Sequence, residues 1–237
     1  RFQRRLGAEV GAEDGRQRVP VRHPEMAEAQ NRHIQLQRID VAPELPGALA
    51  LIAWLRDRGV ATAMGHSAAT LEQARAGYAA GGTSTTHLFN AMSGVDHHAP
   101  GLAVAALTDD AAYVELIADG EHVDRSLWPI ITRTKPADRL LLVSDAISLA
   151  GTGNGRARVG GLEVEVTGQR VTLVGTTTLA GSVIALDTAV RNLVSSGVSL
   201  PDAVAAASRN PLALLGVTDR GRIAVGQRAD LVELDRK

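Results

Sequence analysis

Short β-prone runs alternate with amphipathic stretches of helical period from residue 36 onward. Each stretch of helical period places apolar residues on one face, as a helix packed on a sheet requires. The predicted strands are residues 36–42, 60–64, 83–87, 113–118 and 139–144, and the predicted helices between them are residues 47–58, 69–80 and 125–134. Alternation of strand and helix is typical of an α/β protein with parallel strands.

The run at residues 139–144 is almost unbroken in its apolar character, as expected of a parallel strand that is buried on both faces. Polar residues follow each predicted strand, and residues 93–101 form a long loop after one of them. A repeated β-then-α order with polar groups at the strand ends indicates a partial (β/α)8 TIM-type barrel, whose site would lie at the carboxyl ends of the strands.

The pattern changes on either side of this region. Residues 1–35 are arginine-rich and interrupted by glycine and proline, with no sustained period. Beyond Gly151, residues 162–166 and 170–174 predict a hairpin, residues 186–196 and 201–209 predict helices, and residues 221–234 predict a turn and a strand with no partner in view. We therefore predict an unpatterned segment (1–35), a partial barrel (36–215) with a hairpin insertion at about 158–175, and a C-terminal strand (216–237).

Histidines follow two neighbouring strands, since His66 comes directly after residues 60–64 and His87 ends the next run. Carboxyl ends of parallel strands lie side by side, so imidazoles 21 residues apart can point at one centre, for which a divalent metal is the obvious occupant. His122 and Asp145 follow the next two strands and strengthen this interpretation. The alternative is a helix cap and a hydrogen-bonded core residue for the two histidines, a loop residue for His122 and a helix N-cap for Asp145.

Composition narrows the choice of partner and ligand. The net charge is −1 and only 3% of the residues are aromatic, which disfavours nucleic acid and an anionic membrane and favours a small molecule. No apolar run approaches the roughly 20 residues of a membrane span, and we expect a cytoplasmic protein. Cysteine is absent, so His, Asp and Glu are the available metal ligands.

Motifs at the strand ends carry a resemblance to a known family. They are Gly65-His66-Ser67, Thr86-His87-Leu88-Phe89-Asn90-Ala91-Met92, Asp119-Gly120-Glu121-His122-Val123, Val143-Ser144-Asp145-Ala146 and Leu179-Ala180-Gly181-Ser182. In this order, over about residues 39–235, they resemble the N-acetylglucosamine-6-phosphate deacetylases of the amidohydrolase superfamily. The Gly-x-x-Ala-Asp-Leu-Val pattern near the C-terminus resembles the superfamily as a whole.

The resemblance implies a metal-dependent barrel with a small β-sandwich, which removes the acetyl group from a sugar phosphate. It implies zinc or iron at His66 and His87, with Asp145 as the acid/base. It implies a homodimer for the full-length family. The residues that would hold the sugar phosphate are Asn90, Ala91, His98, His122, Leu179, Ala180, Gly181 and Ser182.

Two departures from the family pattern stand out. The family takes a third metal ligand from a His-x-Glu-Gly-Pro-Phe motif upstream of the first histidine, and this sequence contains no such motif. The family also has an arginine two residues before Pro-Gly, at the position of His98. A histidine can donate to a phosphate but lacks the two-pronged donor group of arginine.

Two rival functions stay open at the level of sequence. One is another amidohydrolase, such as a dihydroorotase or adenine deaminase, although lysine occurs only at positions 135 and 237, which disfavours a carboxylated-lysine site. The other is a remnant without an active site that serves interaction only.

Overall fold

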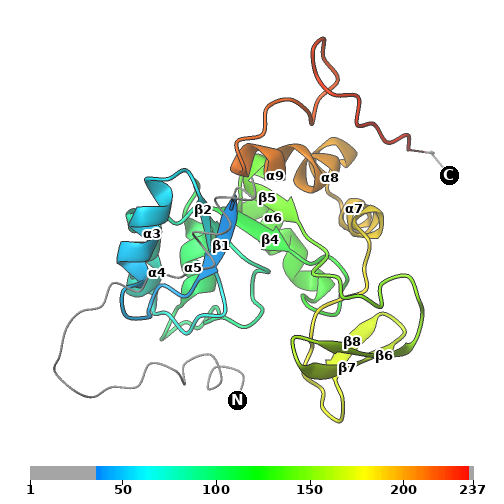
Figure 1. The fold of residues 1–237 in the computed structure, drawn as a ribbon, viewed down its shortest axis with the longest axis horizontal. Coiled ribbons are helices and arrows are strands. Elements are labelled where there is room, and N and C mark those ends of the chain that lie inside the picture. The colour runs from blue at the N-terminus through cyan, green and yellow to red at the C-terminus, as the bar shows by residue number, and fades with distance from the viewer. Residues whose placement is uncertain (1–35, 235–237) are drawn as a thin grey trace. The chain divides into compact units, whose positions relative to one another are not determined.

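A computed structural model describes residues 36–234 of the chain (Figure 1). Five parallel strands form its main sheet, and their order in the sheet is their order in the chain. They are β1 (Arg38–Val41), β2 (Ala61–Met64), β3 (Ser84–Thr85), β4 (Tyr113–Leu116) and β5 (Leu140–Leu142). Sequential order and parallel pairing are what successive β-α units of a barrel produce.

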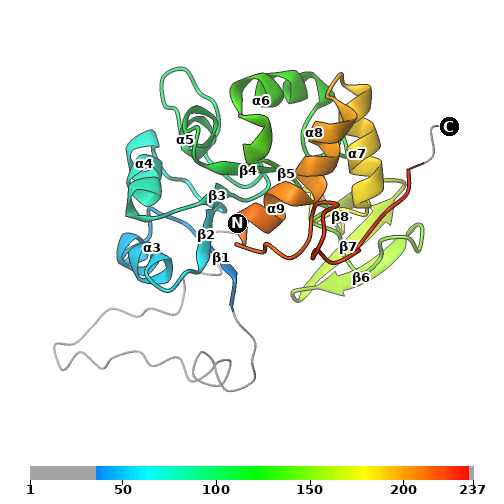
Figure 2. The ribbon, with the colours of Figure 1, turned by 90° about the horizontal axis from the view of Figure 1, so that it is seen from above.

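Helices connect these strands and cover one face of the sheet, along which Figure 2 shows them in an arc. Those between the strands are α3 (Ala48–Arg56), α4 (Leu71–Ala80), α5 (Leu102–Thr108) and α6 (Trp128–Thr134), with single 3-10 turns at Arg125–Leu127 and Ala137–Arg139. Those after the strands are α7 (Leu186–Ser195), α8 (Leu200–Ala207) and α9 (Arg209–Leu214). None of the helices within residues 36–234 is long and apolar enough to cross a membrane.

Helix α4 shows how local sequence sets these boundaries. Thr70 is its N-cap and accepts a hydrogen bond from the Gln73 backbone N–H at 3.3 Å, while the Gln73 side chain accepts one from the Thr70 N–H at 2.9 Å. This capping box satisfies two N–H groups that the first turn leaves free. Gly81, with a φ of 126°, ends the helix before β3.

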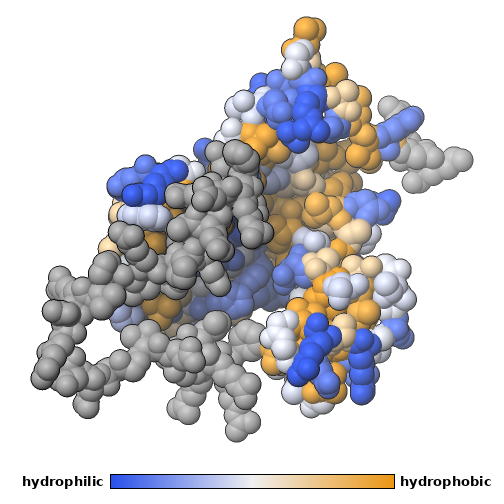
Figure 3. Space-filling model, viewed as in Figure 1, coloured by the Kyte–Doolittle hydropathy of each residue, from blue (hydrophilic) through white to orange (hydrophobic). Residues whose placement is uncertain are grey.

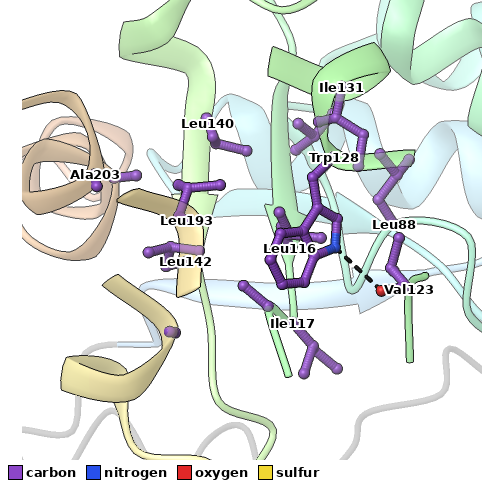
Figure 4. Packing of buried hydrophobic residues seen from close by; sticks show 14 of the residues in the cluster. Leu88, Leu116, Ile117, Val123, Trp128, Ile131, Leu140, Leu142, Leu193 and Ala203 are labelled. Atoms are coloured by element: carbon purple, nitrogen blue, oxygen red, sulfur yellow. Dashed lines mark hydrogen bonds between the residues drawn. The ribbon is translucent and has the colours of Figure 1, made fainter. Parts of the chain in front are cut away.

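The helix-facing side of the sheet forms the largest core (Figure 4). Val114 and Leu116 of β4 point into it, as do Leu140 and Leu142 of β5. Trp128 at the start of α6 is fully buried among them, and its indole N–H donates a hydrogen bond to the Val123 carbonyl at 3.1 Å. We refer to this side as the outer face.

The opposite side, which we call the inner face, is polar and lined by small residues. Side chains alternate across a strand, so Arg38 and Asp40 of β1 and Glu115 of β4 lie on this side. Arg38 Nη2 lies 3.2 Å from Asp40 Oδ1 and 2.5 Å from Glu115 Oε1. The Arg38–Glu115 ion pair on the inner face therefore connects β1 to β4.

A second, antiparallel sheet follows the main one. Its strands are β6 (Gly155–Val159), β7 (Leu162–Thr167) and β8 (Arg170–Leu173), and β7 lies in the middle. Val164, Val166 and Val171 form a separate small core against residues that flank Asp145 and Gly181, including Ile147 and Ala180.

The predicted parallel strands and the helices between them are confirmed. The sequence interpretation missed α5 and β6, and it extended the helix at 201–209 across Ser208, where α8 ends and α9 begins. The unpatterned segment 1–35 lies outside the described residues.

The predicted C-terminal strand is wrong for the residues that the structure describes. Residues 215–234 contain turns and irregular backbone, because none of the strands within 36–234 pairs with them. Several of their apolar side chains are exposed, Val225 completely and Ile223 to 90%. Hydrophobic residues lie on the surface at the top of Figure 3, where Figure 1 shows this segment. Backbone groups of a strand need a partner, which is missing here. The domain boundary at 215 and the β-sandwich stay predictions.

Candidate active site

The ends of β2 and β3 bring the two predicted metal ligands together. The Nε2 atoms of His66 and His87 lie 3.0 Å apart, and the two rings are nearly perpendicular at 82°, with centroids 4.8 Å apart. Thr70 and not His66 caps α4, so the helix-cap alternative does not hold for His66. Within residues 36–234, Nδ1 of His87 is buried without a hydrogen-bond partner, while its Nε2 lies within hydrogen-bonding distance of His66. The pair is therefore either a hydrogen-bonded contact or two ligands of one ion.

This arrangement fits two ligands of one metal ion. Imidazole nitrogens bound to zinc at about 2.0–2.1 Å in a tetrahedral arrangement lie roughly 3.3 Å apart. Burial and the neighbouring His87 lower the pKa of His66, against the opposite effect of the Asp40 and Asp145 carboxylates. A lowered pKa favours the neutral imidazole, which is the form that binds a metal. Within residues 36–234, no group of three or more His, Asp or Glu side chains is placed to hold an ion.

The backbone around the site is strained. The described residues other than glycine that have a positive φ all follow β2, β3 or β5, and they are His66 (47°), His87 (27°), Phe89 (74°), Ala91 (49°) and Asp145 (50°). Residues with a Cβ avoid this region, and such outliers cluster at functional sites.

Asn90 and Ala91 tie the loop after β3 to the end of β2. The Asn90 amide donates to the carbonyls of His87 at 3.2 Å and Leu88 at 3.1 Å, and the Ala91 carbonyl accepts from the Ser67 N–H at 3.0 Å. In this structure the Asn90 side chain therefore supports the turn that carries His87.

Glu44 supports the other histidine, although the sequence interpretation did not single it out. Its carboxylate accepts hydrogen bonds from the Ser67 hydroxyl and the Ala68 N–H, both at 2.7 Å. The signal in the sequence was weak, since Glu44 lies in the turn after β1, more than 20 residues from its partners.

His122 forms a buried pair with Asp119, another residue that the sequence interpretation did not assign. Nδ1 of His122 lies 2.7 Å from Asp119 Oδ2, and the two side chains are 5% and 2% exposed. Burial raises the pKa of Asp119, but hydrogen bonds from the His122 ring and from backbone N–H groups outweigh it, so the pKa lies below its ordinary value. Engagement of Nδ1 sets the ring orientation and leaves Nε2 as the free nitrogen.

Asp145 follows β5 at the same edge of the sheet. It is not a helix cap, because residues 146–154 contain no helix. Its carbonyl accepts a hydrogen bond from the Ser182 N–H at 2.8 Å, and the Ser182 hydroxyl donates to the Ser144 carbonyl. The turn at 179–182 is thus held beside Asp145, and the Asp145 charge reaches His66, whose pKa it raises.

Among the described residues, no hydrogen bond, ion pair or ring contact joins His98 to the histidine pair, and the same holds for His122 and the turn at 179–182. His98 is exposed on the loop after β3, with its ring 3.9 Å from that of His97. Its backbone N–H donates to Asp96 at 2.7 Å, and this bond, with one from Ala99, lowers the pKa of the Asp96 carboxyl.

Parallel strands with histidines and an aspartate at their carboxyl ends are typical of (β/α)-barrel proteins. The chain belongs to the amidohydrolase family, whose model matches residues 37–236. Its fold is part of a TIM-type barrel, as predicted.

Curated relatives that are similar to this chain in sequence are deacetylases of amino-sugar phosphates. The chain is 40% identical over 202 residues to N-acetylgalactosamine-6-phosphate deacetylase of Escherichia coli O157:H7, covering 84% of this chain and 53% of the relative. It is 40% identical over 205 residues to human N-acetylglucosamine-6-phosphate deacetylase, covering 83% of this chain and 50% of the relative. The chain thus spans about half the length of these curated relatives.

Solved structures that are similar to this chain belong to the same kind of deacetylase. A mutant N-acetyl-D-glucosamine-6-phosphate deacetylase of Mycobacterium smegmatis, in complex with N-acetyl-D-glucosamine 6-phosphate, matches with a TM-score of 0.83 and 38% identity, covering 90% of this chain and 56% of that one. The deacetylase of Thermotoga maritima matches with a TM-score of 0.79 and 36% identity, covering 84% and 55%.

Proposed function

We propose that this protein acts in the metal-dependent deacetylation of N-acetyl-D-glucosamine 6-phosphate to D-glucosamine 6-phosphate and acetate. The observation that carries the proposal is the His66–His87 pair, whose Nε2 atoms meet at 3.0 Å within reach of the Asp145 charge. The names of similar proteins support the substrate, and one of them has been solved with this sugar phosphate.

In this proposal His66 and His87 hold zinc or iron, because imidazole suits both metals. When bound, such an ion polarises the amide carbonyl and lowers the pKa of water. Asp145 takes the proton from the attacking water and returns it to the leaving nitrogen, so that a C–O bond forms as the C–N bond breaks. The imidazolium form of His122, whose Nδ1–H is held by Asp119, donates its Nε2–H to the carbonyl oxygen as negative charge develops there.

The remaining assignments concern the sugar phosphate. The turn at 179–182 is held beside Asp145 by the Ser182 N–H and hydroxyl, and Asn90 and Ala91 bond the residues at the ends of β3 and β2. We assign both segments to the sugar phosphate. His98 is assigned to the phosphate. A homodimer and a cytoplasmic location stay predictions.

Metal analysis tests the site directly. We expect the purified chain, dialysed against zinc, to retain one ion, and the His66→Ala/His87→Ala variant to retain none, because the ligands are gone. His97→Ala is the matched control, since this exposed histidine lies outside the proposed site. Equal zinc content in the unaltered and double-variant proteins would show that the ion is not held there.

Acetate release tests the chemistry. We expect Asp145→Asn, which keeps the size of the side chain and removes the proton acceptor, to lower deacetylation by at least about 10²-fold with zinc content unchanged. Near-normal turnover in this variant would assign the acid/base role elsewhere. A chain that binds zinc but releases no acetate from N-acetylglucosamine or N-acetylgalactosamine 6-phosphate would favour the inactive-remnant alternative.

A further inference from the structure

We propose that Glu115 is a positioning residue that holds His87 in its metal-binding orientation through the His87 backbone, and that Arg38 holds Glu115 in turn. This inference rests on the proposed metal site. It assigns a role in that site to the inner face of the sheet.

Glu115 contacts the end of β3 from the neighbouring strand. It is 5% exposed, and its Oε2 atom accepts hydrogen bonds from the Thr86 hydroxyl at 3.0 Å and from the His87 N–H at 3.3 Å. The Glu115 carbonyl also accepts from the Leu88 N–H at 2.7 Å. Three successive residues that include the metal ligand are thus bonded to one residue of β4.

The His87 ring lacks the support that a ligating histidine ordinarily has. Such a ring usually donates its second N–H to a carboxylate, carbonyl or water, which fixes its orientation. Nδ1 of His87 is buried and has no hydrogen-bond partner in the structure. The His122 ring, by contrast, has Asp119 at its Nδ1. Within residues 36–234, the contacts that fix His87 are therefore those of its backbone.

That backbone is strained and needs to be held. His87 has a φ of 27°, which a residue with a Cβ keeps only where its surroundings impose it. Glu115 holds the N–H of His87, and the Asn90 side chain and N–H hold its carbonyl at 3.2 and 3.0 Å. These hydrogen bonds fix both the N–H and the carbonyl of His87, the groups on either side of its Cα.

Arg38 keeps the Glu115 carboxylate in place. Its Nη2 lies 2.5 Å from Glu115 Oε1, whereas the His87 N–H bonds Oε2. The contact is one of charge, because Nη2 has no hydrogen-bond partner among the described residues. Burial raises the pKa of Glu115, while Arg38 and the hydrogen bonds from Thr86 and His87 lower it. An apolar pair of similar volume often serves stability as well as a buried ion pair, so stability alone does not account for these charges.

Cobalt(II) binding by the purified chain, measured by equilibrium dialysis, tests the inference together with urea unfolding. We expect Glu115→Gln to weaken Co²⁺ binding by about 10- to 100-fold, the usual scale for a group that orients a metal ligand. Glutamine keeps the shape but brings an NH₂ group where an acceptor is needed. Glu163→Gln, an exposed carboxylate on β7, is the matched control and should bind as the unaltered chain does.

Histidine NMR separates this inference from the proposed function. In the metal-free chain, we expect the ring ¹⁵N and ¹H signals of His66 and His87 to shift in Glu115→Gln while those of His122 stay, because only the first pair loses its geometry. Failure of the unaltered chain to bind Co²⁺ would contradict the proposed metal site and leave the NMR result to decide the positioning role. Folded Glu115→Gln with unchanged His87 signals, or with unchanged Co²⁺ affinity, would overturn that role.

Discussion

The outer and inner faces of the parallel sheet bury different chemistry. The outer face packs Val114, Leu116 and Trp128 into an apolar core under the helices. The inner face carries Arg38, Asp40 and Glu115, which are charged and lie next to the histidine pair. Apolar burial stabilises a fold without direction, whereas charged hydrogen-bonding groups fix positions at little net gain in stability. The comparison predicts that the two faces respond differently to substitution.

The largest effect is expected on the outer face. Trp128→Ala should lower the free energy of unfolding by about 3–5 kcal/mol, because it removes a fully buried indole and its bond to the Val123 carbonyl. Urea unfolding measures this. Trp54→Ala is the matched control, since Trp54 is 39% exposed. The amount of zinc bound per folded molecule should stay unchanged in Trp128→Ala. A selective loss of zinc in this variant would show that the outer face also affects metal binding.

The inner face should show a different pattern. Arg38→Met leaves the buried Glu115 carboxylate without its cation, and we expect a loss of about 3 kcal/mol, the low end for a broken buried pair because Arg38 is 28% exposed. Arg38→Met/Glu115→Leu removes both charges but leaves the Thr86 hydroxyl and the His87 N–H without their acceptor, so it should recover only part of that stability. Urea unfolding of the two variants decides the point. A double variant as unstable as the single one would mean that the pair itself stabilises the fold.

Lys135 tests whether a buried charge behaves in the same way on the outer side, because it is a cation buried there. Its ammonium is 3% exposed and donates to the Ala106 carbonyl at 3.0 Å and to the Asp109 carbonyl. Burial lowers the pKa of Lys135, against the opposite effect of Asp109 and Asp110. We expect Lys135→Met to cost about 1–3 kcal/mol, since two carbonyls lose their donor.

The pH dependence of that difference follows from the lowered pKa. Between the folded pKa and the ordinary value of 10.5, the unfolded chain binds more protons than the folded chain, so the Lys135 contribution to stability rises with pH. Unfolding of both proteins at neutral pH and near pH 10 should show the gap widen toward alkaline pH. A gap that narrows would contradict the assigned direction.

The smallest effect is expected where the second sheet meets the first. Arg170 of β8 pairs with Glu121, next to His122, at 3.2 Å, and both side chains are substantially exposed. Arg170→Ala should change the free energy of unfolding by less than about 1 kcal/mol. Arg156→Ala, which breaks a pair within the second sheet, is the control. A larger loss in Arg170→Ala alone would show that this contact holds the two sheets together.

The elements that sequence predicts well are those with one buried side. Helix α5 escaped because its residues 102–108 are apolar all round, and five of them are buried, so no amphipathic period marks it. Strand β6 was missed because its less exposed positions hold Gly155 and Ala157, which are not β-prone. The terminal strand was predicted from local pattern alone, although a strand exists only with a partner.

The same division applies to the site. His66, His87, His122 and Asp145 are candidates that the sequence offers, because each lies at or just past the end of a β-prone run and parallel strands end at the same edge of a sheet. Glu44, Asp119 and Glu115 act through contacts that only the folded chain reveals. Glu115 lies inside a strand, where the local pattern gives it no function, and its partner His87 is 28 residues away.

The left-handed backbone at His66, His87 and Asp145 has a consequence for how this sequence tolerates mutation. Glycine at any of these positions relieves strain, so His87→Gly should stabilise the fold while it removes a proposed ligand. In a copy released from selection for chemistry, the fold would therefore tolerate glycine or asparagine at these three positions. Their replacement in a homologous gene would mark the loss of function before any change in the core.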